Sequence, residues 1–332
     1  MRAFTGFLKG INFGGWLSQC DHTKERYDTF ITAEDFAEVK NRGYDHIRVP
    51  IDYELIVDDD MNVNEDGFSY IDFAIENCRK NGLNMVLDLH RTIGYSFDPG
   101  HNKSGFFENE TYQEYFYQIW DMLSKRYGKN ADMLAFEMLN EVTKKEYSDT
   151  WNRVSTECIK RIRANAPDIQ ILLGGYYNNS VEALKDLALP YDDKIVYNFH
   201  CYEPLLFTHQ GAYWIATMDT SFRCHYKMPF RTYDELSQTQ LRDIYTAYEE
   251  YDPNRCPDEA YFDNLISEAV RVAEERNVPL YCGEYGVIDL ADKADGKEWF
   301  KDFHAVMNKY GIGRAVWTYK EMDFEVEKDL PL

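Results

Sequence analysis

The sequence LNMVLDLH at residues 83–90, followed by MLAFEMLNE at residues 133–141, decides the fold class of this chain. Both runs are short and largely apolar, and both end in polar or ionisable side chains. Continuous apolar runs of this length are typical of parallel strands that are buried on both faces. A helical pattern rather than a tight turn is therefore expected to connect each strand to the next.

Six further runs of the same kind occur along the chain. They are FLKGINF at 7–13, DHIRVP at 45–50, IQILLGG at 169–175, KIVYNFH at 194–200, PLYCGEYG at 279–286 and RAVWTY at 314–319. Between the runs, apolar residues recur with helical spacing, and Thr32 with Asp35 resembles a capping box. The clearest helical stripes lie at residues 68–78, 151–162, 262–272 and 299–310.

Eight strands that alternate with helices predict an α/β protein with one (β/α)8 TIM barrel, spanning residues 1–332 as a single domain. An open doubly wound sheet is the alternative, but no glycine-rich dinucleotide fingerprint follows the first strand. Residues 201–260 form an unusually long connection after the sixth strand, rich in polar and aromatic side chains. We expect this insertion to fold over the mouth of the barrel.

Composition narrows the possible partners. The formal net charge is −22, which disfavours nucleic acid and anionic membrane surfaces. Aromatic residues make up 16% of the chain, a surplus that suggests a binding groove. The seven cysteines are scattered without metal-ligand spacing, which favours buried thiols over a disulfide framework. We expect a monomer. Because no signal peptide or membrane span is evident, we expect the protein to be either cytoplasmic or secreted in a form that lacks its signal.

Polar side chains gather where the predicted strands end, which is where a barrel builds its active site. Glu141 ends the fourth strand and Glu284 the seventh. Two facing carboxyl groups suit glycoside hydrolysis: one protonates the leaving oxygen, and the other attacks the anomeric carbon. The remaining strand-end residues are Asn12, Arg48, His90, Asn140, His200, Tyr202 and Trp317.

These neighbours have expected roles. Arg48 and Tyr202 are placed to hold Glu284 as an anion, and Asn140 to donate to a sugar 2-hydroxyl. His90 and His200 lack a third ligand at His or Cys spacing, so we expect neither a metal nor a cofactor. Further substrate contacts are expected from strand-end and loop residues, because aromatic faces pack on sugar rings. These candidates are Asn12, Trp16, Tyr95, Phe207, His209 and Trp214.

Taken together, the motifs resemble glycoside hydrolase family 5 of clan A. They are IRVP at 47–50, DLH at 88–90, LNEV at 139–142, FHCY at 199–202, GEYG at 283–286 and AVWTY at 315–319. The resemblance implies that Glu141 is the acid/base and Glu284 the nucleophile. The opening GINFGGWLSQ and the segment YNFHCYEPLLFTHQ are similar to the clostridial endoglucanase C type of cellulase. Arg91 departs from the pattern, since close relatives often carry a second histidine there.

The expected activity is therefore retaining, endo-acting hydrolysis of β-1,4-glucan, either cellulose-type or mixed-linkage. The same chemistry on mannan, glucomannan, xyloglucan or β-1,3-glucan remains open, because loop residues distinguish these substrates. A barrel that only binds carbohydrate is a second alternative, although binding alone requires neither an acid nor a nucleophile. A metal-dependent hydrolase is a third, and it predicts loss of activity in chelator.

Overall fold

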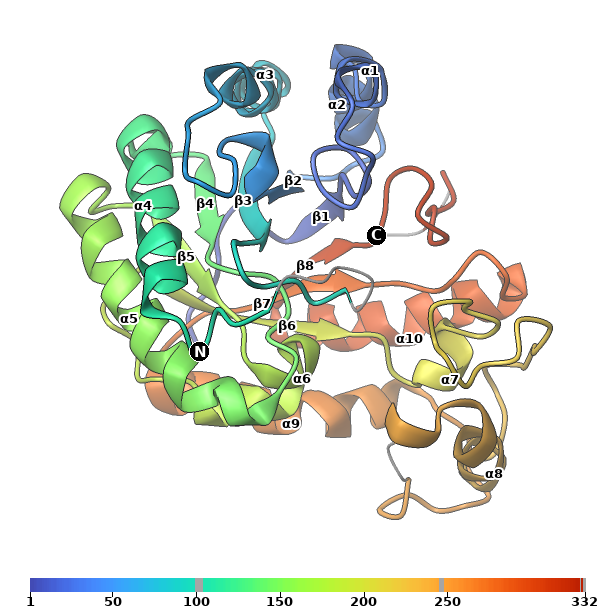
Figure 1. Ribbon diagram of the computed structural model, residues 1–332. Coiled ribbons are helices and arrows are strands. Elements are labelled where there is room, and N and C mark those ends of the chain that lie inside the picture. The colour runs from blue at the N-terminus through green and yellow to red at the C-terminus, as the bar shows by residue number, and fades with distance from the viewer. Residues whose placement is uncertain (99–103, 245–247, 329, 331–332) are drawn as a thin grey trace.

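Eight parallel strands close into a barrel in the order in which they occur along the chain (Figure 1). The computed structural model describes residues 1–98, 104–244, 248–328 and 330. Every strand predicted from the sequence is present, and the closed barrel confirms the predicted fold class. The strands are β1 (Lys9–Asn12), β2 (His46–Asp52), β3 (Asn84–Arg91), β4 (Leu134–Glu137), β5 (Gln170–Leu173), β6 (Ile195–Cys201), β7 (Leu280–Tyr285) and β8 (Gly313–Val316).

Helices surround the strands in Figure 1. The long ones carry an apolar stripe toward the barrel and charged residues toward solvent, as their spacing predicts. They are α2 (Ala33–Asn41), α3 (Glu65–Asn81), α4 (Glu110–Tyr127), α5 (Ser148–Asn165), α9 (Glu259–Arg276) and α10 (Lys293–Tyr310). The shorter α-helices are α1 (Lys24–Thr29), α6 (Tyr176–Asn179), α7 (Leu205–Thr208) and α8 (Phe230–Gln240). Single 3₁₀ segments are η1 (Tyr53–Leu55), η2 (Gly128–Asn130), η3 (Lys145–Tyr147), η4 (Val181–Asp186) and η5 (Arg242–Ile244).

Local signals in the sequence set several helix ends. The capping box that begins α2 is present, with the backbone N–H of Thr32 donating to Asp35 Oδ2 at 2.7 Å. Gly82 ends α3 in a left-handed conformation at φ 63°, which glycine adopts without steric cost. In α4, for which no apolar stripe was predicted, Phe116, Trp120 and Leu123 are fully buried at helical spacing. That helix is held by the same apolar contacts as its neighbours.

The two ends of the barrel differ in polarity. At the N-terminal end, the Phe4 and Phe7 rings stack at 4.1 Å and join the small apolar side chains inside the barrel. Tyr281 packs there too, and its hydroxyl lies 2.7 Å from His46 Nε2. This end is therefore filled and dry. The charged groups that line the barrel interior gather toward the opposite end, where a ligand can reach them.

The segment between β6 and α9 contains its own short helices, α7 and α8, which lie outside the ring of helices beside α9 and α10 (Figure 1). Tyr226 and Lys227 both bind Asp302 on α10, at 3.0 and 2.6 Å. Phe230 packs near Tyr261 at the start of α9. This part of the insertion is therefore fastened to the start of α9 and to the middle of α10. No helix within the described ranges is both long and apolar enough to cross a lipid bilayer.

Candidate active site

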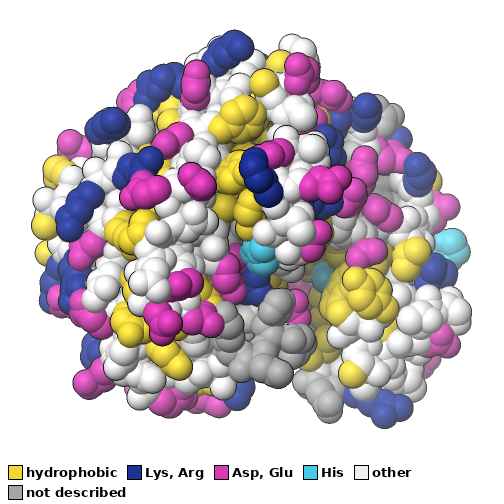
Figure 2. All heavy atoms as spheres, turned by 45° about the horizontal axis from the view of Figure 1, so that its top comes forward, with side chains coloured by type: hydrophobic (Ala, Val, Ile, Leu, Met, Phe, Trp, Pro, Cys, Tyr) yellow, Lys and Arg dark blue, Asp and Glu magenta, His cyan; other side chains and the backbone are white. Residues whose placement is uncertain are grey.

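The predicted site residues converge at one rim of the barrel. Because the strands are parallel, their carboxyl ends meet at the same edge, and side chains far apart in sequence become neighbours. The side chains brought together in this way are Arg48, His90, Asn140, Glu141, His200, Tyr202, Glu284 and Trp317. Figure 2 shows histidine side chains inside a hollow of the surface, with hydrophobic side chains gathered beside it.

Glu141 and Glu284 face each other across this rim. One carboxylate oxygen from each and a ring nitrogen of His200 lie within 4.8 Å of one another. Both glutamates are nearly buried, with 9% and 5% of their surface exposed. A retaining glycosidase places its carboxyl groups about 5–5.5 Å apart, and an inverting enzyme about 6.5–9.5 Å apart. The short distance between the nearest oxygens agrees with the closer spacing of a retaining enzyme.

Glu284 is held as a carboxylate by two donors. Arg48 Nη1 lies 2.8 Å from its Oε1, and the Tyr202 hydroxyl donates to Oε2 at 2.9 Å. Burial raises the pKa of Tyr202 well above its usual value, so the phenol keeps its proton and stays a donor. A cation and a neutral donor both favour the charged form of the carboxyl group. These contacts agree with the expected role of Arg48 and Tyr202.

Arg48 also organises the floor beneath the pair. Its guanidinium binds Glu137 through two hydrogen bonds of 2.7 and 2.8 Å, and its Nη2 lies 3.0 Å from Asp88 Oδ2. It also donates to Asn140 Oδ1 at 2.9 Å. Three buried carboxyl groups share this one guanidinium, and burial raises the pKa of Glu137 and that of Asp88, the latter to about 7.

Glu137 was missed by the sequence analysis. Its signal is a charged residue inside the otherwise apolar run at 133–139, which is costly to bury unless it is paired. Asp88 was quoted within the DLH motif but given no role. Its Oδ2 lies 2.5 Å from His90 Nδ1, so it orients that ring.

Glu141 sits in a different environment from Glu284. Burial raises its pKa, which favours the protonated form required of a general acid. His200 Nδ1 lies 2.8 Å from its Oε1, and Asn178 Nδ2 donates to its Oε2 at 2.9 Å. Its backbone has a φ of 45°, a conformation that residues other than glycine rarely adopt. Asn178 on α6 was not anticipated, because the left-handed turn that brings it to Glu141 has no signal in the sequence.

His90 and His200 are neutral at ordinary pH, because burial lowers the pKa of each to about 4. The His90 ring stacks parallel to Trp317, with 5.9 Å between ring centroids. Trp317 is mostly buried and completes the wall next to His90. Asn140 Nδ2 is buried and has no hydrogen-bond partner among the described residues. That this nitrogen donates to a sugar 2-hydroxyl stays a prediction.

Four of the expected substrate contacts are corrected by the structure. Trp16 and Phe207 are fully buried, and Trp16 Nε1 donates to a backbone carbonyl, so neither ring can meet a sugar. Asn12 is also fully buried and accepts from Arg48 at 3.0 Å, so it supports the floor. Tyr95 is 6% exposed, and its hydroxyl donates to the backbone carbonyl of Glu141 at 2.6 Å. Burial of loop and strand-end side chains depends on packing that the sequence does not show.

His209 and Trp214 remain candidates for substrate contact. The His209 ring packs edge-on against Tyr202, with ring centroids 5.1 Å apart. Trp214 lies next to it and is 40% exposed. Both come from the first part of the insertion, which borders the site, whereas α8 lies farther out. That the insertion covers the cleft stays a prediction.

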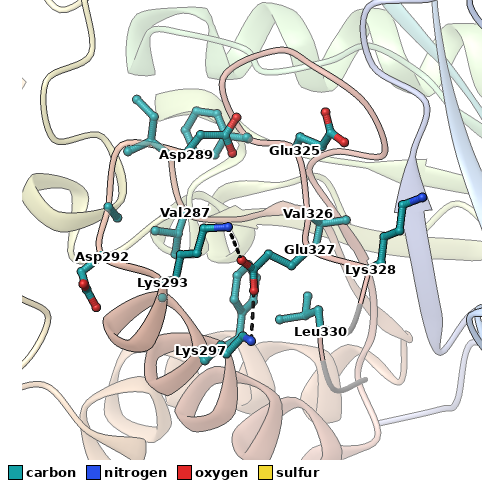
Figure 3. Close-up of a pocket in the computed structure, with 15 residues that line it drawn as sticks. Val287, Asp289, Asp292, Lys293, Lys297, Glu325, Val326, Glu327, Lys328 and Leu330 are labelled. Carbon is teal, nitrogen blue, oxygen red and sulfur yellow. Dashed lines mark ion pairs between the residues drawn. The ribbon is translucent and has the colours of Figure 1, made fainter.

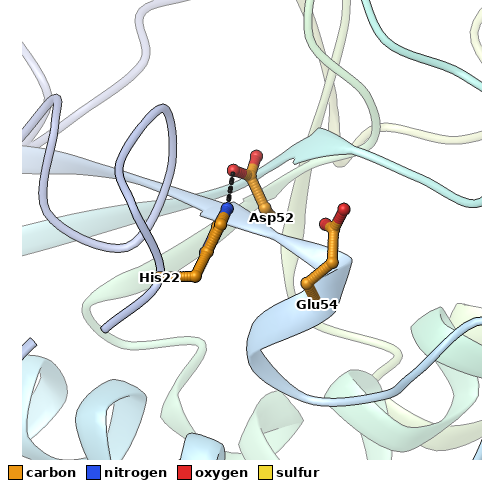
Figure 4. A group of neighbouring side chains, drawn as sticks. All are labelled: His22, Asp52 and Glu54. Carbon is orange, nitrogen blue, oxygen red and sulfur yellow. Dashed lines mark ion pairs between the residues drawn. The ribbon is translucent and has the colours of Figure 1, made fainter. Parts of the chain in front are cut away.

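Among the described residues, two groups of side chains have a spacing that could hold a metal ion. One is Glu141, His200 and Glu284, and the other is His22, Asp52 and Glu54 (Figure 4). In the second group, Arg91 Nη2 lies 2.5 Å from Asp52 Oδ2 and 2.9 Å from His22 Nε2. A guanidinium therefore stands where a cation would bind. In the first group, the donors described above already occupy the carboxylate oxygens, so the donor chemistry of neither group favours a metal.

A separate cavity of about 520 Å³ lies between the start of α10 and residues 324–328 and 330 (Figure 3). Glu327 reaches Lys293 at 2.8 Å and Lys297 at 3.1 Å across it. None of the site residues predicted from the sequence lines this cavity. The carboxylate pair, not this cavity, is therefore the candidate active site.

Comparison with known proteins gives a consistent result. Residues 9–323 match the family described as "Cellulase (glycosyl hydrolase family 5)". The chain is 45% identical to cellodextrinase A of Ruminococcus flavefaciens over 93% of its own length and 84% of that protein. It is 40% identical to endoglucanase C of Acetivibrio thermocellus, over 96% and 93%.

Solved structures show the same fold. Cel5A of Thermotoga maritima, in a study of its complexes with cellobiose, superposes with a TM-score of 0.77 at 22% identity, over 98% of this chain and 93% of that one. The cellulose synthase subunit Z of Clostridioides difficile gives a TM-score of 0.75 at 26% identity, over 96% and 94%.

Proposed function

Because this chain belongs to glycoside hydrolase family 5, we propose that it cleaves β-1,4-glucan internally and with retention, using Glu284 as nucleophile and Glu141 as acid/base. The observation that supports this assignment is the carboxylate pair within 4.8 Å, whose members have opposite surroundings. Glu284 faces a guanidinium and a phenol, which favour the anion. Glu141 is buried with a raised pKa, which favours the acid.

In the first step, Glu284 attacks the anomeric carbon while the proton of Glu141 passes to the departing glycosidic oxygen. The bond between sugar and leaving group breaks, and an ester forms between the sugar and Glu284. In the second step, Glu141, now ionised, takes a proton from water, and the resulting hydroxide displaces Glu284. Two inversions at the same carbon give net retention.

The remaining side chains position the sugar. Asn140 Oδ1 accepts from Arg48, and its Nδ2 has no partner among the described residues, so a hydrogen bond from Nδ2 to the 2-hydroxyl would strengthen as positive charge develops on the ring. The neighbouring rings of His209 and Trp214 offer apolar faces at the edge of the site. The names of the relatives, an endoglucanase and a cellodextrinase, support β-1,4-glucan or its oligosaccharides as the substrate.

The test combines a substrate panel with product stereochemistry. The panel contains carboxymethyl cellulose, barley mixed-linkage glucan, glucomannan, xylan and laminarin, and new reducing ends and viscosity are measured on each. We expect activity with falling viscosity on the first two, and proton NMR of early products should show the β-anomer first. Activity confined to glucomannan or laminarin would move the substrate to another β-glycan. A folded chain that binds but cuts none of these would contradict the assignment as a hydrolase of this panel.

A further inference from the structure

The chain after β5 makes a left-handed turn that lies next to Glu141. Tyr177, Asn178 and Asn179 have φ values of 50°, 57° and 57°, so three consecutive side-chain-bearing residues lie in the left-handed region. This conformation costs on the order of 1–2 kcal/mol per residue, least for asparagine. Strain of this kind persists where surrounding contacts fix it, and it clusters at functional sites.

The turn is fastened to the end of β4, immediately beside the proposed acid/base. The backbone N–H of Asn178 donates to the carbonyl of Val142 at 3.0 Å. The side-chain amide of the same residue donates to Glu141 Oε2 at 2.9 Å. Asn178 therefore binds both the side chain of Glu141 and the backbone carbonyl of the residue that follows it.

The next residue reaches the other side of the same carboxyl group through a histidine. Asn179 Nδ2 lies 3.4 Å from His200 Nε2, and His200 Nδ1 lies 2.8 Å from Glu141 Oε1. A donor at Nε2 leaves the proton of the neutral ring on Nδ1, from which it donates to Glu141. Gly174 makes room for this arrangement, since a Cβ there would lie 2.1 Å from Asn179 Oδ1.

We propose that Asn178 is a positioning residue that orients the carboxyl group of Glu141 and stabilises its ionised form between the two steps of the reaction. This inference rests on the proposed role of Glu141 as acid/base. A hydrogen bond donated to a carboxylate favours the charged form and opposes the effect of burial. Glu141 must be an acid in the first step and a base in the second, so its proton has to be released as well as held.

The direction of the effect follows from the lost hydrogen bond. Removing the amide donor leaves the carboxylate less stabilised, so Glu141 keeps its proton to higher pH. The alkaline limb of kcat/KM should then move upward by roughly half to one pH unit, a modest shift because Asn178 is exposed to water. The hydrolysis of the glycosyl-enzyme should slow, because a carboxyl group that has lost this donor is less well oriented to activate water.

The experiment uses Asn178→Gly and Asn178→Asp. Glycine keeps the left-handed turn without strain and removes the amide, whereas aspartate keeps the shape but replaces the donor with a like charge. Tyr177→Gly is the matched control, because Tyr177 is exposed in the same turn and its ring packs against Tyr176 instead of the carboxylate pair. The pH dependence of kcat/KM is measured on mixed-linkage glucan and on 2,4-dinitrophenyl β-cellobioside, whose leaving group needs no proton.

We expect both Asn178 variants to shift the alkaline limb upward on glucan, aspartate the more, while Tyr177→Gly leaves it in place. An unchanged limb with a raised KM would overturn the inference, since Asn178 would then only touch the substrate. An equal shift in Tyr177→Gly would also overturn it, because the backbone turn would be responsible. The pH profile of Glu141→Gln on glucan separates failure of the acid/base assignment from failure of the role of Asn178. If the alkaline limb survives in that variant, the acid/base assignment fails, and with it the basis of this inference.

Discussion

Glu141 and Glu284 occupy one pocket but face different partners. A guanidinium and a phenol hold Glu284, whereas burial and neutral amide and imidazole donors surround Glu141. Two like charges at this separation repel, so the surroundings decide which carboxyl group is ionised. Because protons on such a pair are coupled, solution measurements report the titration of the pair as a unit.

Replacing Glu141 with glutamine should lower kcat/KM on natural glucan by about 10²–10⁴-fold, because the leaving oxygen loses its proton donor. On 2,4-dinitrophenyl β-cellobioside the first step should be nearly unaffected, so a burst of dinitrophenol should precede slow turnover. Stopped-flow absorbance measures the burst. Equal losses on both substrates would contradict the acid role of Glu141.

The pH profile of the unmodified enzyme should be bell-shaped. The acid limb marks protonation of the nucleophile, and the alkaline limb marks loss of the proton from Glu141. Burial raises the pKa of Glu141, so the form that carries the proton persists above the ordinary range of a glutamic acid, and activity is lost as pH rises through that raised value. Both limbs are measured from initial rates on mixed-linkage glucan between about pH 3 and pH 10, a range that extends below and above the usual pKa of a glutamic acid. A flat acid side would be incompatible with an ionised nucleophile.

At the scale of elements, α9 and α10 serve two purposes. Their apolar faces cover the barrel, and the start of α9 and the middle of α10 hold the outer part of the insertion. Asp302 on α10 receives hydrogen bonds from Tyr226 and Lys227. These contacts lie away from the carboxylate pair, so we expect this part of the insertion to stabilise the fold and to take no part in catalysis.

Replacing Asp302 with alanine should therefore lower the free energy of unfolding by about 1–3 kcal/mol, because a buried tyrosine loses its acceptor and a partly buried lysine loses one of its acceptors. Hydrolysis of the dinitrophenyl substrate should remain within about twofold, since no catalytic group moves. Thermal and urea unfolding measure the first effect and initial rates the second.

The matched control is Asp263→Ala, which removes an ion pair between α9 and Lys309 of α10 whose two side chains are 34% and 50% exposed. A surface pair of this kind contributes little, so we expect a change within about 0.5 kcal/mol. Equal effects of the two substitutions on the free energy of unfolding would contradict this stabilising role of the insertion.

The whole molecule separates packing from chemistry along the barrel axis. Aromatic and small apolar side chains fill the N-terminal end, and charged side chains line the opposite end around Arg48. The acidic surface, with a net charge of −22, suits a neutral polysaccharide and disfavours polyanions. The separation lets loops at one end vary without weakening the core at the other.

Neither the fold nor the reaction should require a metal. Incubation with EDTA, followed by removal of the chelator complex, should leave both kcat/KM and the unfolding midpoint unchanged. The physical reason is that the Arg91 guanidinium is bound to Asp52, and that Arg48 and Tyr202 each donate to one oxygen of Glu284. A loss of activity that added divalent cations restore would refute this view.

The sequence by itself determined the barrel and most of the carboxylate site. Apolar runs with helical stripes between them are local patterns, and each strand-end motif reports its own position on the rim. These motifs therefore predicted that Arg48, His90, Glu141 and Glu284 would meet, because parallel strands share one carboxyl edge.

Only the tertiary structure decided which neighbours complete the site. Asn178 reaches Glu141 because a left-handed turn after β5 bends back to β4, and Glu137 pairs with Arg48 across the barrel interior. Trp16 and Phe207 have the composition of sugar-binding rings, yet packing buries them completely. Contacts across a closed barrel depend on strand register and side-chain packing among many elements at once, and no local pattern in the sequence encodes them.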